Sequence, residues 1–150
     1  MRIGRTVFVG SSKRTNREGI AQLSDILRPY DYQVNPVAVT GCLHLKSACS
    51  YVGNNTILIN RVWIDARPLL TFELIDVAEE EPAAANAVLV KDVVVLPQSF
   101  PQTRALLELR GFRVTTIDVS ELQKAEAGVT CTSLIFDDLG TQASLPASLS

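Results

Sequence analysis

The chain has 150 residues, of which 47% are hydrophobic and 20% are charged, and its formal net charge is −2. This length and composition predict one folded domain with a sizeable core. They indicate neither a nucleic-acid partner nor a membrane span, because no basic cluster is present and no apolar run approaches roughly 18 residues. The N-terminus lacks the apolar stretch of a signal peptide, and the three cysteines form no Cys-x-x-Cys pair, so we expect a cytoplasmic protein without a disulfide framework.

The N-terminal part of the chain predicts a strand, a helix and a second strand. A β-rich run at residues 5–9 ends in a Gly-Ser-Ser turn. Thr15 or Asn16 then supplies the N-cap of a helix, which Pro29 closes. Residues 32–39 contain three valines and indicate the next strand.

The middle of the chain is more mixed. Residues 41–53, GCLHLKSACSYVG, favour a short helix or an irregular turn over a strand. Residues 54–60, NNTILIN, and residues 72–77 indicate strands. The acidic run at residues 79–81 is expected to lie in a solvated loop.

The C-terminal part predicts the order strand, strand, helix, strand. Two β-branched runs flank residues 91–92 and indicate a hairpin, residues 103–110 indicate a helix with Gly111 as its C-cap, and residues 112–119 indicate a strand. The first part of the chain has a similar order, so mixed sheets with helices on the outside are expected. The residues after Phe136 are small and polar, which predicts a domain at residues 1–136 and a flexible tail at residues 137–150.

One stretch, KAEAGVTCTSLIF at residues 124–136, has the features of a nucleophile loop. Small residues precede Cys131. An apolar segment at residues 133–136 follows, and we expect it to be a strand. A thiol on such a turn would be held rigidly and still be reachable, as a nucleophile requires. The ordinary alternative is a small buried cysteine at the start of a strand.

His44 is the single histidine, so any imidazole chemistry must use it. If the fold brings His44 to Cys131, the pair could act as acid/base and nucleophile, because a neighbouring imidazolium lowers a thiol pKa from roughly 8.5. A satisfied core or turn histidine is the alternative. Cys42 and Cys49 bracket His44, but a metal site would need a fourth ligand. We therefore expect ordinary thiols there, with no metal and no cofactor.

Several stretches resemble the dimethylargininase (dimethylarginine dimethylaminohydrolase) branch of the pentein, or amidinotransferase, superfamily. The Leu-His-Leu-Lys run at residues 43–46 and the Gly-Val-Thr-Cys run at residues 128–131 are the specific parts. The matching stretches follow the order of that family and cover nearly all of residues 1–136: VFVGSSKRTNREG at 7–19, LHLKSACSYVGNN at 43–55, EEEPAAANAVLV at 79–90, LPQSFPQTRALLELRGFRV at 96–114 and AGVTCTSLIF at 127–136.

The resemblance implies an α/β fold, a partial pentein propeller of ββαβ-type modules that forms roughly the later half of a five-module domain. It also implies a hydrolase that converts N-methylated arginine to citrulline and methylamine or dimethylamine through a covalent thiouronium intermediate. Cys131 matches the nucleophile and His44 the acid/base. Arg14 matches an arginine that grips the substrate α-carboxylate, and the backbone near Ala125 matches a position that touches the α-amino group. Arginine deiminase or amidinotransferase-like activity is the alternative within the superfamily.

The sequence departs from the family pattern in its carboxylates. Residues 1–4 match the strand that directly follows a Glu-Gly-Gly-Asp-like run in the family, and neither the carboxylate partner of the histidine nor the acids that clasp the guanidinium have a match here. None of residues 79–81 and Asp118 matches those roles. A hypothesis of another class is therefore a truncated pentein fragment that is catalytically incompetent or depends on a partner, either a missing N-terminal half or a homo-oligomer.

Overall fold

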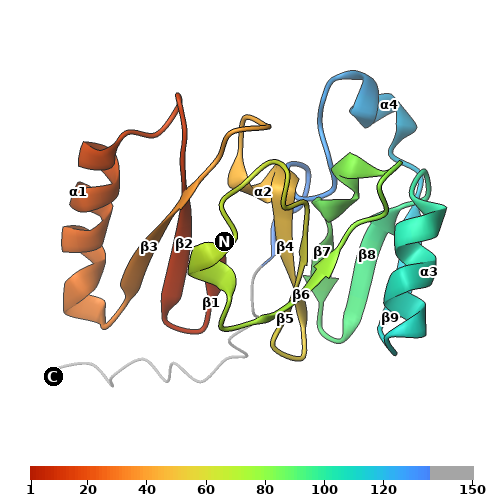
Figure 1. Ribbon diagram of the computed structural model, residues 1–150, viewed down its shortest axis with the longest axis horizontal. Coiled ribbons are helices and arrows are strands. Elements are labelled where there is room, and N and C mark those ends of the chain that lie inside the picture. The colour runs from red at the N-terminus through yellow and green to blue at the C-terminus, as the bar shows by residue number, and fades with distance from the viewer. Residues whose placement is uncertain (136–150) are drawn as a thin grey trace, which may run out of the picture.

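The computed structural model describes residues 1–135; Phe136 and the expected tail at residues 137–150 lie outside the described residues. Three small sheets stand side by side in a row, with a long helix at each end of the row (Figure 1). The first sheet and its helices comprise β1 (Arg2–Ile3), β2 (Thr6–Ser11), α1 (Arg17–Leu27), η1 (Arg28–Tyr30) and β3 (Gln33–Ala38).

The second and third sheets follow in chain order. The second comprises α2 (Leu45–Ala48), β4 (Cys49–Gly53), β5 (Thr56–Ile59), η2 (Arg67–Leu69) and β6 (Glu73–Asp76). The third comprises η3 (Pro82–Ala85), β7 (Val88–Val90), β8 (Val93–Pro97), α3 (Pro101–Leu109), β9 (Arg113–Ile117) and α4 (Ser120–Lys124). No helix of residues 1–135 has the length and apolar character needed to cross a membrane.

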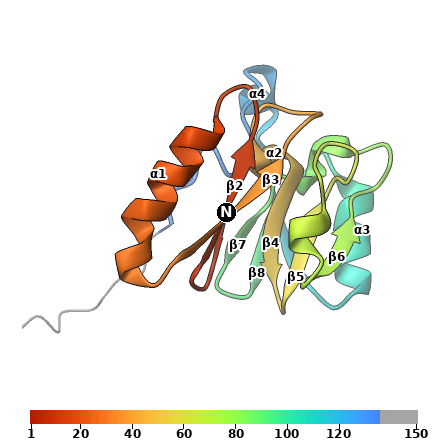
Figure 2. The ribbon, with the colours of Figure 1, turned by 60° about the vertical axis from the view of Figure 1, so that its left-hand side comes forward.

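The three sheets repeat one topology. In each, the first two strands pair antiparallel and the second and third pair parallel, after a crossover through α1, η2 or α3. The two long helices cover the outer sheets: α1 packs on β2 and β3, and α3 packs on β9 (Figure 2). Because parallel strands need such crossovers whereas antiparallel strands need only a hairpin, each unit is a ββαβ-type module. The expected α/β class and module type are confirmed.

Local chemistry explains several of the element boundaries. The Asn16 side chain accepts a hydrogen bond of 2.8 Å from the Gly19 N–H, so Asn16 is the N-cap of α1. After α3, Gly111 takes a left-handed backbone with φ +83° and donates its N–H to the Glu108 carbonyl at 3.0 Å, which ends the helix. The hairpin between β7 and β8 turns at Lys91, whose φ is 57°.

Two segments differ from the sequence expectations. Residues 41–53 contain the strand β4, which the mixed pattern did not indicate, because the strand is defined by its pairing with β5 across a turn of left-handed Asn54 and Asn55. The strand expected at residues 133–136 is wrong for the part that is described. Residues 133–135 pair with no strand of residues 1–135, and Leu134 is 86% exposed.

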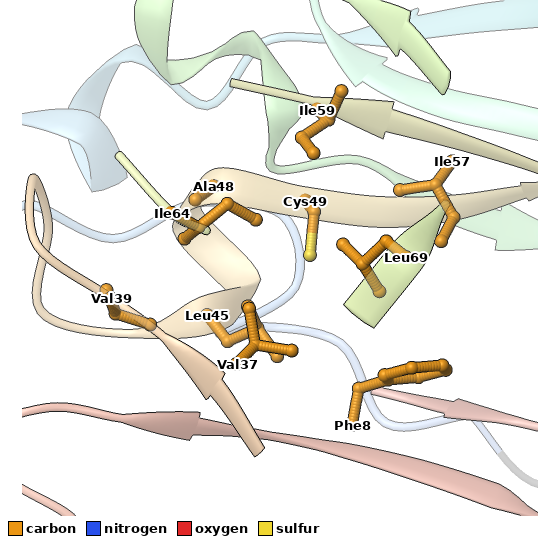
Figure 3. Close-up of a cluster of buried hydrophobic side chains, with 10 residues drawn as sticks. All are labelled: Phe8, Val37, Val39, Leu45, Ala48, Cys49, Ile57, Ile59, Ile64 and Leu69. Carbon is orange, nitrogen blue, oxygen red and sulfur yellow. The ribbon is translucent and has the colours of Figure 1, made fainter. Parts of the chain in front are cut away.

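Two hydrophobic clusters join the three modules. The first lies between modules one and two and contains Cys49, whose sulfur points in among the apolar side chains (Figure 3). The second lies between modules two and three. Successive β5 side chains point to opposite faces, so Ile57 and Ile59 enter the first cluster and Leu58 the second. Module two is therefore the shared centre of the molecule.

The acidic run at residues 79–81 is not wholly solvated, which corrects the expectation for that loop. Glu81 is only 6% exposed. Its carboxylate accepts hydrogen bonds from the Gln102 N–H at 2.9 Å and the Thr103 N–H at 2.7 Å, in the first turn of α3. Free N–H groups at a helix start favour a carboxylate, so Glu81 ties η3 to α3.

Candidate active site

The fold brings Cys131 and His44 to the same cavity, although they lie far apart in the sequence. A cavity of about 720 Å³ is lined by both residues, together with parts of η3 and the segment after α4. A second hollow of about 480 Å³ is also lined by both, and its other walls come from β2 and α2. The two side chains therefore stand where the two hollows meet.

Cys131 lies on a tight turn with its side chain exposed. Its N–H donates to the Gly128 carbonyl at 3.1 Å, which closes the turn. Hydrogen bonding to the Gly128 backbone lowers the pKa of the Cys131 thiol. Burial opposes this effect and is the next largest cause, and the Thr130 hydroxyl, the Lys46 charge and the Asn86 side chain lower the pKa by smaller amounts. A lowered pKa increases the fraction of reactive thiolate at neutral pH.

Asn86 packs directly beneath this turn. Its Oδ1 accepts a hydrogen bond of 3.0 Å from the Thr130 N–H, and the residue is 8% exposed. A Cβ added at Gly128 would lie 2.6 Å from Asn86 Cγ, so only glycine permits the approach. This role of Asn86 could not be predicted from the sequence, because an asparagine after a Pro-Ala-Ala-Ala run carries no local signal of a partner 44 positions away.

The loop that carries His44 is held by a close backbone approach. The N–H groups of Thr40 and Gly41 both donate to the Trp63 carbonyl, at 2.9 and 3.1 Å. A Cβ at Gly41 would lie 2.7 Å from Trp63 Cγ. His44 follows as the exposed residue before α2, and its carbonyl accepts from the Ser47 N–H at 2.9 Å and from the Cys42 thiol at 3.2 Å.

The two predicted substrate-binding residues are placed differently. Ala125 lines the larger cavity with Cys131 and His44. Arg14 lies in the exposed turn between Ser12 and Thr15, where its backbone N–H donates to the Ser12 hydroxyl at 3.2 Å. Ser12 and Thr15 line the smaller hollow, whereas Arg14 lines neither. The structure therefore groups three of the four predicted residues and leaves Arg14 at the margin.

The wall of the larger cavity contains one carboxylate within residues 1–135, that of Glu126. Among the described residues, Glu126 is the one charged residue in its lining. Glu126 directly follows Ala125, the predicted contact of the α-amino group, and has a left-handed φ of 58°. A single carboxylate in the wall of a cavity favours a cationic ligand over an anionic one.

The cysteines near His44 do not form a metal site with it. Cys49 is 1% exposed and lies in the hydrophobic cluster of Figure 3, where burial raises the pKa of its thiol to about 12. Within residues 1–135, no group of three or more His, Cys, Asp or Glu residues could hold a metal ion. Cys42 lines the larger cavity as a free thiol, and its pKa is raised, chiefly by burial.

Comparison with known proteins points to one enzyme family, although no family model matches the chain. The N(G),N(G)-dimethylarginine dimethylaminohydrolase of Pseudomonas aeruginosa is 35% identical over 136 residues, which is 91% of this chain and 54% of the relative. The protein of the same name from Streptomyces coelicolor is 33% identical over 140 residues, 93% of this chain and 53% of the relative. The chain thus spans about half the length of the curated relatives it matches.

Solved structures show the same similarity. A mutant of the Pseudomonas aeruginosa DDAH (dimethylarginine dimethylaminohydrolase), complexed with citrulline, superposes with a TM-score of 0.82 at 34% identity, over 91% of this chain and 53% of that one. The amidinotransferase SxtG from Microseira wollei has a TM-score of 0.82 at 19% identity, over 93% of this chain and 46% of that one, which shows the fold alone.

Proposed function

Since this chain is DDAH-like and its structure neighbours are pentein enzymes, we propose that it hydrolyses the guanidino group of an N-methylated arginine to citrulline and methylamine or dimethylamine. The observation that carries the proposal is the cavity that holds both Cys131 and His44. Arginine deiminase or amidinotransferase-like activity would use the same two groups on another guanidino substrate.

The chemistry assigns one role to each group. The Cys131 thiolate attacks the guanidinium carbon, and the new C–S bond gives a tetrahedral intermediate. His44 donates a proton to the methylated nitrogen, the C–N bond breaks and the amine leaves. The remaining thiouronium is attacked by water that His44 deprotonates, and the C–S bond breaks to release citrulline and restore the thiol.

The geometry and the charges support this assignment. The lowered pKa of Cys131 increases the fraction of thiolate at neutral pH. The larger cavity, at about 720 Å³, lies within the range of small-molecule sites, roughly 300–1,000 Å³. The Glu126 carboxylate in its wall favours the positive charge of a guanidinium or an α-ammonium group.

The ends of the substrate are assigned to the other two predicted residues. The backbone at Ala125 would contact the α-amino group in the larger cavity. Arg14 would reach from its exposed turn to the α-carboxylate, for which the planar donors of a guanidinium are suited. All three cysteines are free thiols, and we place the protein in the reducing cytoplasm on that ground.

A second candidate is a pentein segment whose turnover depends on further residues, supplied by additional chain or by another copy. One observation favours it: the larger cavity has a single lining carboxylate among residues 1–135, whereas a guanidinium is held best by paired carboxylates. Citrulline release by this chain, measured with and without added carboxylate-bearing modules from a relative, separates the two candidates. Equal citrulline release with and without the added modules would exclude the second candidate.

Covalent labelling tests the nucleophile without requiring turnover. An amidine-bearing electrophile should modify one thiol, located by mass spectrometry, and Cys131→Ser should abolish the modification. Cys42→Ser is the matched control, because it removes the other thiol of the cavity and should leave labelling unchanged. Labelling at the full rate in Cys131→Ser would contradict the proposed function.

A further inference from the structure

We infer that Asn86 is a positioning residue for Cys131: its side-chain amide holds the turn at residues 128–131 and directs its N–H donors toward the side of the thiol. The inference rests on the proposed role of Cys131 as the nucleophile. Asn86 directly follows η3 and is far from the turn in the sequence.

Asn86 is itself firmly anchored. Its backbone N–H donates to the Ala83 carbonyl at 3.2 Å, at the end of η3. The next residue, Ala87, donates its N–H to the Ser50 hydroxyl at 3.1 Å, on β4. Backbone contacts on both sides of Asn86 therefore fix the origin of the side chain, which is 8% exposed.

The turn is in contact with this amide along its length. At one end, Gly128 approaches Asn86 so closely that a Cβ would lie 2.6 Å from Cγ and 2.8 Å from Oδ1. Further along, the Thr130 N–H donates to Oδ1 at 3.0 Å. The hydrogen bond from Cys131 N–H to the Gly128 carbonyl closes the turn around the amide. Asn86 thus fills the concave side of the loop that carries the sulfur.

The hydrogen bond at Thr130 sets the orientation of the amide. An N–H needs an acceptor, so the oxygen of Asn86 faces Thr130 and the NH₂ group is left for the rest of the turn. Hydrogen-bond donors near a thiol stabilise the thiolate relative to the neutral form. The pKa of the Cys131 thiol is lowered, and the Asn86 side chain makes the smallest of the contributions that lower it, in the direction that this orientation requires.

Asn86→Asp separates positioning from simple structural support. The aspartate keeps the shape and an oxygen acceptor for Thr130, but it replaces the NH₂ donors by a negative charge. We expect the Cys131 pKa to rise, and a rise of about one unit lowers the thiolate fraction about tenfold at pH values below that pKa. The measurement is the pH dependence of Cys131 alkylation by iodoacetamide, resolved by mass spectrometry.

Asn60→Asp is the matched control. Asn60 is 6% exposed, and its amide also bridges two segments: Oδ1 accepts from the Val62 N–H at 3.0 Å and Nδ2 donates to the Pro82 carbonyl at 2.9 Å. It lines neither cavity that Cys131 lines. This variant should lose stability like Asn86→Asp and leave the alkylation profile of Cys131 unchanged.

An unchanged profile in folded Asn86→Asp overturns the inference. If circular dichroism shows that Asn86→Asp does not fold, Gly128→Ala decides, because its methyl group displaces the amide without altering its chemistry: a raised Cys131 pKa supports the inference and an unchanged pKa overturns it. The alkylation rate needs no substrate, so a failure of citrulline release would count against the proposed function and leave this measurement intact.

Discussion

Removing the Glu81 carboxylate should destabilise the third module far more than its place in an acidic loop suggests. Glu81→Ala leaves two N–H groups at the start of α3, those of Gln102 and Thr103, without their acceptor. A buried donor left unpaired costs about 1–3 kcal/mol, and loss of a helix cap typically costs about 1 kcal/mol. We therefore expect the free energy of unfolding to fall by about 2–4 kcal/mol.

Urea and thermal unfolding measure this effect. At about 2–4 °C per kcal/mol for a chain of this size, Tm should drop by about 5–15 °C. Glu81→Gln should lose less, because its amide oxygen still accepts one of the two bonds. Glu80→Ala is the matched control: it removes the same charge from an exposed neighbour and should stay within about 0.5 kcal/mol. Equal stability of Glu81→Ala and Glu80→Ala would refute the capping argument.

The remaining predictions concern the loop of His44 and the two contrasting thiols. Gly41→Ala should lower the free energy of unfolding by about 1–3 kcal/mol in urea titrations, because its methyl group would lie 2.7 Å from Trp63 Cγ; an unchanged midpoint would contradict the close approach. Iodoacetamide at pH 7.5 should modify exposed Cys131 and spare buried Cys49 until the chain unfolds. Burial raises the pKa of Cys49 from 9.0 to about 12, so the unfolded chain releases that proton first, and stability should fall above pH 9 by up to about 1.4 kcal/mol per pH unit. Cys49→Ala should make the free energy of unfolding fall less steeply above pH 9. An identical slope in the variant and the parent protein would contradict the role of Cys49 in this decline.

Much of the fold follows from local pattern. The cap at Asn16, the apolar run of β5 and the two-residue turn at Lys91 each depend on neighbours close in sequence, so their residue types are sufficient to indicate them. Strand β4 depends instead on its partner, because Cys49–Gly53 becomes a strand by pairing with β5. The strand predicted at the apolar residues after Ser133 is wrong for the same reason. Their composition favours a strand, but no described strand lies beside them.

In the candidate site too, some features follow from local sequence and others depend on distant segments. The thiol and the imidazole could be named from residue type and resemblance, since each is a rare group with few alternative roles. Their shared cavity, the support from Asn86 and the acidic wall at Glu126 arise from contacts between distant segments. Glu81 shows the difference most directly, because its sequence neighbours are exposed whereas the amides that it binds lie about twenty residues further along the chain.

The position of β5 has a consequence for how the molecule opens. All four residues of the strand are buried, since its two faces belong to different hydrophobic clusters and both of its edges are paired. Fraying of α1 or α3 exposes one outer sheet and leaves the middle strand covered. Its amide protons should therefore exchange with deuterium only when both neighbouring units have separated, which makes β5 the slowest-exchanging segment of residues 1–135.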